Sequence, residues 1–340
     1  MAQPATLIVG PSWVGDMVMA QALFILLKRR HPDTAFDVLA PAWSLPIVAR
    51  MPEVRRGIAA ETGHGELGLG KRRRIGYALR DEGYEQAIVL PRSLKSALIP
   101  WFARIPRRTG FRGESRYGLI NDMRPFDKAV LDQTVKRFVA LGLEPDESLP
   151  EIPYPELAVD RGKQSAVMDS LGIITDRPVV AMMPGAEYGP AKCWPIEYFS
   201  ELSGRLADAG FDVWVLGSEK DAPAGEAIAT ASAAHNLCGR TALEDVIDLL
   251  GYAEQAVSND SGLMHIAAAV GTHVHGIYGS SSPAFTPPLT SARDIHCLEL
   301  DCSPCFERTC PLGHLRCLKE LSVERLYDAV LSANRRIKSA

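Results

Sequence analysis

The chain has 340 residues, 46% of them hydrophobic and 23% charged, and a net charge of −4 at pH 7. This composition is typical of a globular protein long enough for two domains, and it excludes a disordered chain. No apolar run approaches the roughly 18 residues that a membrane-spanning helix needs, and the first residues lack the features of a signal peptide, so we expect a cytosolic protein.

Charge is distributed unevenly along the chain. Residues 1–140 contain 22 Lys and Arg against 13 Asp and Glu, a net charge of +9, whereas the remaining residues contain 15 against 28, a net charge of −13. This asymmetry indicates that the first half meets an anionic partner. Nucleic acid is disfavoured, because the basic residues are not interleaved with aromatic ones. An anionic membrane surface or a phosphorylated lipid fits, and the run Lys71–Arg74 also fits a solvated face.

The first half alternates apolar strands with helices. We predict a strand at Thr6–Gly10, a helix that starts near Met17 and ends at Arg30 before Pro32, and strands at Phe36–Leu39 and Ala87–Leu90. This alternation predicts a parallel sheet covered on both faces, in which ligands bind beyond the carboxyl ends of the strands.

An acidic residue follows the first predicted strand. The segment Gly10-Pro-Ser-Trp-Val-Gly-Asp16 matches neither a dinucleotide fingerprint nor a phosphate-binding P-loop, since Asp16 stands where the P-loop lysine would follow. Asp16 in a first helical turn can simply complement the helix dipole. Its place at a strand's carboxyl end favours a chemical role instead.

A proline-rich stretch separates two similar halves. Residues 140–177 contain Pro145, Pro150, Pro153 and Pro155, which indicate a linker. The second half repeats the alternation, with these predicted elements: strands at Pro178–Met183, Val213–Leu216 and Val274–Tyr278, and helices at Ile196–Ala209, Leu243–Leu250 and Val323–Lys338.

Two loops of the second half are candidates for a diphosphate site. One is Gly185–Lys192, which supplies small residues and a cation; the other is Asp260-Ser-Gly262, where a short strand turns into an Ala-rich helix that carries His265 one turn later. The free N–H groups of a helix start attract phosphate, and a lysine opposite them is a suitable counter-ion. Taken singly, Lys192 fits a surface charge and His265 a structural histidine; together with the helix start they predict a phosphate site.

Four of the seven cysteines cluster as Cys302-x₂-Cys305-x₄-Cys310-x₆-Cys317, with His314 inside. In a reducing compartment such a cluster favours metal over disulfides, and four thiolates suit tetrahedral Zn²⁺. The spacing lacks the paired Cys-x₂-Cys form, so thiols without a metal remain the alternative. Any metal there would be structural.

Several motifs, in order, carry a resemblance over nearly the whole length. They are Gly10-Pro-Ser-Trp-Val-Gly-Asp16, Ala40-Pro-Ala-Trp43, Leu90-Pro-Arg-Ser-Leu-Lys-Ser96, Arg108-Thr-Gly-Phe-Arg-Gly-Glu114, Arg116-Tyr-Gly-Leu119, Pro184-Gly-Ala-Glu-Tyr-Gly-Pro-Ala-Lys192, Asn259-Asp-Ser-Gly-Leu-Met-His265 and Tyr278-Gly-Ser-Ser-Ser-Pro-Ala-Phe-Thr-Pro-Pro-Leu289. With these motifs the chain resembles the ADP-heptose:lipopolysaccharide heptosyltransferases of glycosyltransferase family 9, most closely those called heptosyltransferase II.

The resemblance implies an α/β protein of the GT-B class, with two Rossmann-like doubly wound domains facing each other across a cleft. Residues 1–160 would bind the acceptor, residues 161–322 the ADP-heptose, and the helix 323–340 would pack back on the N-terminal domain. The implied activity is inverting transfer of L-glycero-D-manno-heptose from ADP-heptose to the first heptose of the inner core on Kdo-lipid A, with no cofactor needed for the chemistry. The implied location is cytoplasmic, peripheral at the inner face of the inner membrane.

The resemblance also implies roles for individual residues. Asp16 and Lys192 would be catalytic, as general base and as counter-ion of the leaving ADP. The remaining donor-binding residues would be Gly185, Ala186, Glu219, Thr241, Asp260, Ser261, Gly262 and His265, and the acceptor-binding residues Ser12, Ser93, Lys95 and Arg112. Two alternatives stay open: heptosyltransferase I or another nucleotide-sugar transferase of the family, and a nucleotide-sugar-binding protein without turnover. Retention of both Asp16 and Lys192 speaks against the latter.

Overall fold

The computed structural model describes residues 3–60 and 66–339, and the chain forms two compact units. The first unit extends to Pro155 and the second starts at Glu156. The predicted boundary at residue 160 thus lies a few residues beyond the observed one.

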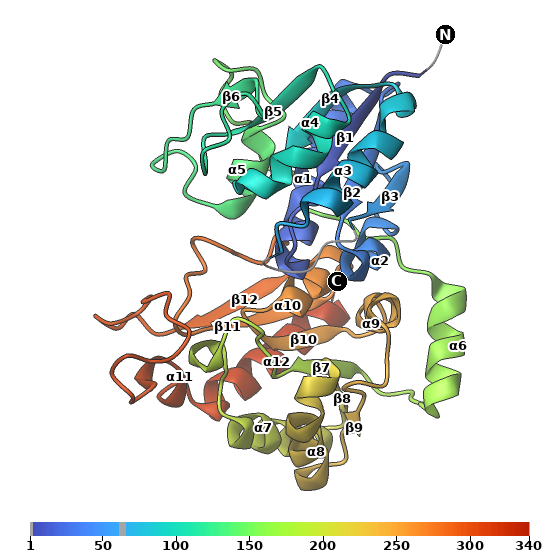
Figure 1. The fold of residues 1–340 in the computed structure, drawn as a ribbon. Coiled ribbons are helices and arrows are strands. Elements are labelled where there is room, and N and C mark those ends of the chain that lie inside the picture. The colour runs from blue at the N-terminus through green and yellow to red at the C-terminus, as the bar shows by residue number, and fades with distance from the viewer. Residues whose placement is uncertain (1–2, 61–65, 340) are drawn as a thin grey trace. The chain divides into compact units, whose positions relative to one another are not determined.

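The first unit contains a six-stranded parallel sheet with the order β3-β2-β1-β4-β5-β6 (Figure 1). Its strands are β1 (Ala5–Val9), β2 (Ala35–Ala40), β3 (Arg56–Ala59), β4 (Tyr84–Val89), β5 (Arg107–Phe111) and β6 (Asp122–Arg124). Its helices are α1 (Val14–Arg30), α2 (Leu45–Val48), α3 (Leu69–Ala78), α4 (Leu98–Phe102) and α5 (Thr134–Ala140). Short 3₁₀ turns lie at Ala42–Ser44, Arg80–Glu82 and Leu94–Ala97.

The helix α1 is the central helix of this unit. Its residues from Met17 to Leu27 are all buried, because apolar side chains occupy every face rather than one stripe. Asp16 lies in the first turn and Lys28, Arg29 and Arg30 in the last, so both ends complement the helix dipole.

The second unit repeats this plan, with the sheet order β12-β11-β10-β7-β8-β9 and every strand pair parallel. Its strands are β7 (Val179–Met183), β8 (Asp212–Val215), β9 (His235–Asn236), β10 (Gln255–Asn259), β11 (His273–Tyr278) and β12 (Arg293–Cys297). Its helices are α6 (Arg161–Leu171), α7 (Ile196–Asp208), α8 (Ala222–Ala231), α9 (Leu243–Leu250), α10 (Gly262–Ala269), α11 (Arg316–Lys319) and α12 (Val323–Ser339), with 3₁₀ turns at Pro190–Lys192 and Glu219–Asp221.

One segment of the second unit differs from the sequence expectation. The stretch predicted to be a linker contains α6, which Asp160 caps by accepting hydrogen bonds from the amides of Gly162 and Lys163. The helix α12 buries Val323 and Leu326 in the hydrophobic core of the second unit, together with Trp194. The apolar face of α12 therefore packs within this unit.

Counted within its own unit, each sheet has the strand order 3-2-1-4-5-6 of a doubly wound dinucleotide-binding fold. The α/β class with two Rossmann-like units is therefore confirmed. None of the helices in the described residues combines the length and the apolar character required to span a bilayer.

Candidate active site

The reversal of strand order marks where a ligand crevice is expected in each unit. In the second unit the reversal falls between β7 and β10, which pair in parallel, so the segments after both strands emerge at one edge of the sheet. These segments are Pro184–Lys192 and Asp260–Gly262, the two loops that the sequence singles out. Their predicted convergence is confirmed within this unit.

An ion pair joins the two loops. Lys192 Nζ donates to Asp260 Oδ2 at 2.6 Å, and the side chains are 17% and 4% exposed. The Lys192 ammonium also lies 5.1 Å from the centre of the Tyr188 ring, a cation–π distance. These contacts fix the position of the Lys192 ammonium, which can also bind an incoming phosphate.

The buried amide of Asn259 fixes both ends of the lysine loop. Its Nδ2 donates to the carbonyl of Pro184 at 2.6 Å, and its Oδ1 accepts the amide N–H of Trp194 at 3.0 Å. Asn259 is fully buried at the end of β10. One side chain thus sets the position of the loop relative to Asp260, a role that the sequence reading missed although Asn259 lies in a quoted motif.

The start of α10 provides the second part of the site. Ser261 is the N-cap residue, with extended backbone angles and no side-chain capping hydrogen bond. Amide N–H groups of this first turn, Gly262 included, are therefore available to an anion. His265 is buried one turn later, and burial lowers its pKa to about 4, with Lys192 acting in the same direction and Asp260 opposing. The imidazole is neutral at pH 7 and can donate one hydrogen bond.

The other predicted donor residues lie after neighbouring strands of the same sheet. Gly185 and Ala186 follow β7, Glu219 follows β8 with an exposed side chain, and Thr241 follows β9. Within the described chain, the buried Oγ1 of Thr241 has no hydrogen-bond partner. A side chain at Gly185 would meet Asp221, since a Cβ there would lie 2.3 Å from Asp221 Oδ1. Any side chain at position 185 would collide with Asp221, so only glycine leaves this stretch of backbone free of that contact.

Two serines at this edge were not among the predicted site residues. Ser280 and Ser281 follow β11 and are 1% and 5% exposed, and their hydroxyls make no hydrogen bond to any described residue. The amide of Ser280 donates to the carbonyl of Ala191 at 3.3 Å, next to Lys192. The sequence signal was a run of serines directly after an apolar strand.

In the first unit the strand order reverses between β1 and β4. Asp16, half-buried in the first turn of α1, lies just beyond β1. Its charge acts on the guanidinium of Arg137 in α5, which contacts the Phe126 ring, as does Arg92. The sequence reading did not connect Arg137 with Asp16, because α5 follows α1 by more than a hundred residues.

The predicted acceptor residues follow the strands of the first unit. Ser93 and Lys95 come after β4, and Arg112 follows β5, the adjacent strand. The two loops are joined by Arg92, whose Nε donates to the carbonyl of Arg112 at 3.2 Å. Ser12 is exposed after β1, and its carbonyl accepts the indole N–H of Trp43 at 3.1 Å.

The buried side chain of Arg116 connects the loops after β4 and β5. It is 1% exposed and donates to the carbonyls of Pro91 and Phe111. Burial, assisted by Arg92, lowers its pKa to about 10. This arginine is therefore a structural cation that holds the loops after β4 and β5.

The four clustered cysteines line one small cavity, about 20 Å³ in volume, together with His314, Ala191 and Ser280. None of Cys302, Cys305, Cys310 and Cys317 forms a disulfide. Burial and the three other thiols raise the pKa of Cys317. The four cysteines thus line the same cavity, but the cysteines of the described chain form no group of three or more whose sulfurs lie within 4.8 Å of one another.

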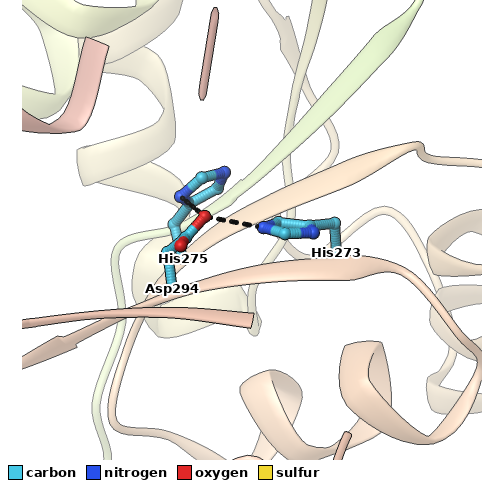
Figure 2. Close-up of side chains that lie close together, drawn as sticks. All are labelled: His273, His275 and Asp294. Carbon is cyan, nitrogen blue, oxygen red and sulfur yellow. Dashed lines mark hydrogen bonds and ion pairs between the residues drawn. The ribbon is translucent and has the colours of Figure 1, made fainter. Parts of the chain in front are cut away.

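A second group has the ligand types of a metal site. Figure 2 shows His273, His275 and Asp294, whose ligand atoms lie within 4.8 Å of one another. Asp294 Oδ2 is 2.8 Å from His273 Nε2 and also accepts from Arg336 at 2.8 Å. Because a guanidinium occupies the same carboxylate oxygen, this group is best described as a charge network. His273 starts β11, so the network lies at the amino edge of the sheet, away from Lys192.

Comparisons with known proteins agree on one family. The profile of glycosyltransferase family 9 (heptosyltransferase) matches residues 72–316. Lipopolysaccharide heptosyltransferase 2 of Salmonella typhimurium is 46% identical over 296 residues, which are 84% of this chain and 85% of that protein. Lipooligosaccharide heptosyltransferase 2 of Haemophilus influenzae is 44% identical over 303 residues, 85% of this chain and 87% of that protein. The structure of ADP-heptose LPS heptosyltransferase II from E. coli has a TM-score of 0.89 at 38% identity and covers 98% of this chain and 99% of its own.

Proposed function

This chain belongs to glycosyltransferase family 9, the heptosyltransferases, and we propose that it moves heptose from ADP-heptose to the first heptose of the lipopolysaccharide inner core. It is an enzyme of heptose transfer in inner-core synthesis, with the GT-B fold of its structural relatives. The observation that carries the proposal is the Lys192–Asp260 pair, held at the start of α10 and at the strand-order reversal of the second unit.

The second unit is the proposed donor-binding unit. Lys192 and the first amides of α10 bind the diphosphate, and the neutral His265 donates a hydrogen bond to it. Asp260 orients the heptose, Glu219 contacts the ribose, and the backbone near Thr241 contacts the adenine. Because Lys192 and helix amides provide the positive charge that a leaving diphosphate requires, the proposed transfer needs no metal for its chemistry.

The proposed reaction is a single displacement that inverts the anomeric carbon. The acceptor hydroxyl attacks C1 of the heptose and gives its proton to the carboxylate of Asp16. The bond from C1 to the diphosphate oxygen breaks, and ADP leaves with both electrons of that bond. A general base of this kind contributes about 10²–10⁴-fold in rate. Stabilisation of the leaving ADP by Lys192 adds the electrostatic contribution.

The first unit is the proposed acceptor-binding unit. The loops after β4 and β5 present Ser93, Lys95 and Arg112, and residues 1–140 carry a net charge of +9. An acceptor rich in phosphate and carboxylate, the heptosylated Kdo-lipid A, matches that charge. We propose that anionic headgroups hold the enzyme at the cytoplasmic face of the inner membrane. Nucleic acid is not among the proposed partners.

A transfer assay with ADP-heptose and three acceptors tests the proposal. The acceptors carry no heptose, one heptose or two heptoses on Kdo-lipid A, and product is detected by mass spectrometry. We expect transfer to the acceptor with one heptose. Transfer only to the heptose-free acceptor would instead identify a heptosyltransferase I activity, and ADP-heptose binding with no transfer to any acceptor would identify a binding protein without turnover.

A further inference from the structure

Two neighbouring helices of the first unit carry an outer surface that the proposed reaction does not use. The helices α3 and α4 lie side by side (Figure 1), and they approach closely because position 76 is glycine: a Cβ at Gly76 would lie 2.5 Å from the Cβ of Phe102. Ile75 of α3 and Ile99 of α4 pack against the hydrophobic core of the sheet. The side chains on the opposite side of each helix therefore point away from the sheet.

The outward side of α3 combines apolar and basic side chains. Leu69, Arg73 and Tyr77 follow one another at intervals of four residues, so they form one stripe along the helix. Leu69 is 53% and Tyr77 41% exposed, and Arg73 and the neighbouring Arg74 are exposed as well. A single exposed apolar side chain is ordinary, whereas several of them beside cations indicate a contact surface.

The end of α4 continues this stripe with aromatic rings. The centre of the Phe102 ring lies 6.3 Å from that of Tyr77 and 4.9 Å from that of Trp101, and both pairs meet edge to face. Trp101 is 45% exposed. The guanidinium groups of Arg73 and Arg80 lie 5.0 Å and 3.9 Å from the centre of the Tyr77 ring. Rings and cations therefore form one continuous surface across the two helices.

Every charged residue in the two segments around these helices is basic. Residues 67–80 contain five Lys and Arg, residues 94–108 contain four, and neither segment contains Asp or Glu. Of these cations, Arg73, Arg74 and Arg104 are exposed and form no ion pair with any carboxylate of the described chain. We call the exposed outer surface of the two helices the α3–α4 face; its members are Leu69, Arg73, Arg74, Tyr77, Trp101 and Arg104.

The composition of this face matches the interface of an anionic bilayer. Trp and Tyr are favoured at the level of the headgroups, where the ring lies in an apolar layer while its polar atom reaches water. Arg and Lys beside anionic headgroups add an electrostatic attraction. Two of the three carboxylates that flank the first segment, Glu66 and Glu82, are already paired with Lys71 and Arg56. A small anion would satisfy the guanidinium groups but leave the rings in water, whereas a bilayer interface accommodates both.

We propose that the α3–α4 face docks on a bilayer of anionic phospholipid, with its rings and its leucine at the level of the headgroups. The turn Leu94–Ala97, which carries Lys95, runs directly into α4. Docking through this face therefore brings the proposed acceptor loop to the membrane surface, where a lipid-linked acceptor lies. This consequence rests on the proposed function, whereas the docking itself does not.

Flotation of the full chain with lipid vesicles tests the docking. One set of vesicles contains phosphatidylethanolamine and phosphatidylglycerol, which is anionic, and the other contains only neutral phosphatidylcholine. We expect the wild type to bind the anionic vesicles and to bind the neutral ones much more weakly. Arg73→Gln/Arg74→Gln should weaken binding to anionic vesicles roughly 25-fold, about fivefold for each charge. Binding by neither set of vesicles, or equally by both, would overturn the proposal.

A second double variant controls for net charge. Arg161→Gln/Arg177→Gln removes two exposed arginines from the second unit, so it changes the net charge equally and leaves the α3–α4 face intact. It should bind anionic vesicles as the wild type does. If both double variants lose the same affinity, the attraction belongs to the whole chain and the assignment to this face is wrong.

Quenching of tryptophan fluorescence by lipids with brominated acyl chains tests the depth of Trp101. We expect quenching in the wild type and its loss in Trp101→Phe, which keeps an aromatic ring at this position. Quenching that persists unchanged in Trp101→Phe would place another surface at the bilayer. A wild type that binds no vesicles but forms dimers, which Trp101→Ala disperses in sedimentation measurements, would assign the face to a second copy of the chain.

Heptose transfer tests the consequence for the acceptor. The acceptor with one heptose is presented in anionic vesicles, or as its oligosaccharide without acyl chains. Arg73→Gln/Arg74→Gln should transfer about tenfold or more slowly in vesicles, in line with its weaker binding, and at the wild-type rate to the free oligosaccharide. Wild-type rates with both acceptors would overturn the link between docking and acceptor access. A wild type that binds vesicles but transfers heptose to neither acceptor would refute the proposed function and leave the docking face standing.

Discussion

The ion pair between Lys192 and Asp260 allows stability and ligand binding to be separated. In Lys192→Met the Asp260 carboxylate, 4% exposed, loses its cation and remains buried. Breaking a buried pair from one side costs 3–5 kcal/mol; because Lys192 keeps 17% exposure, we expect about 3 kcal/mol. This corresponds to a fall of roughly 6–12 °C in the melting temperature of the second unit.

The same substitution removes the charge-assisted hydrogen bond that we propose Lys192 makes to the diphosphate. Such a bond contributes about 1.5–3 kcal/mol, so ADP binding should weaken roughly 10- to 100-fold. Asp260→Asn should not weaken ADP, because the carboxylate competes with the diphosphate for Lys192. The double variant Lys192→Met/Asp260→Asn should regain much of the lost stability, since no buried carboxylate remains, yet bind ADP as weakly as Lys192→Met.

Thermal unfolding and ADP calorimetry on all four proteins provide the two readouts. Lys220→Met is the matched control: its ion pair with Glu187, 2.8 Å long, joins exposed side chains, so its loss should leave the melting temperature close to that of the wild type. Recovery of ADP affinity in the double variant would refute a role of Lys192 at the diphosphate and leave it a purely structural partner of Asp260.

Three further predictions follow from buried groups. Burial lowers the pKa of His265 from 6.5 to about 4, so its contribution to the free energy of unfolding is complete above pH 6.5 and is lost as the pH falls toward 4. The wild type should therefore lose roughly 2 kcal/mol more stability between pH 7 and pH 5 than His265→Gln, as measured by urea unfolding. Asn259→Ala leaves the carbonyl of Pro184 and the amide of Trp194 unpaired, and should cost about 2–4 kcal/mol and weaken ADP, whereas an unchanged ADP affinity would remove Asn259 as the residue that sets the lysine loop. Arg116→Met should lower the calorimetric transition of the first unit by a similar free energy and leave that of the second unit unchanged, since its partners all lie in the first unit; a shift of both transitions would contradict this.

Much of the fold could be predicted from the sequence because its strands are short, apolar and regularly spaced. The predicted strand Pro178–Met183 and helix Leu243–Leu250 match β7 and α9 closely. The helix α6 was missed since its residues are mostly polar and lie among prolines, and Gln164 is its one buried residue. Its tertiary support comes from Asp248, far away in sequence, whose backbone carbonyl accepts from Gln164 Nε2.

The candidate site, like the fold, could be predicted only in part. The approach of Lys192 to Asp260 was predictable, because both follow strands and parallel strands share a carboxyl edge. Their direct pairing was not, since it depends on the two hydrogen bonds of Asn259 that set the loop. Likewise, nothing in the cysteine spacing indicated that residues 305–310 pack on Tyr188 and Ala191, because that contact uses backbone carbonyls of Phe306 and Arg308.

The most direct test of the central claim is the transfer rate of Asp16→Asn. Single-turnover transfer from ADP-heptose to the acceptor with one heptose is measured beside the affinity for ADP-heptose. We predict a rate reduced by about 10²–10⁴-fold with unchanged donor affinity, because the amide cannot accept the hydroxyl proton. Transfer at the wild-type rate would contradict the assignment of Asp16 as the base, and with it this account of catalysis.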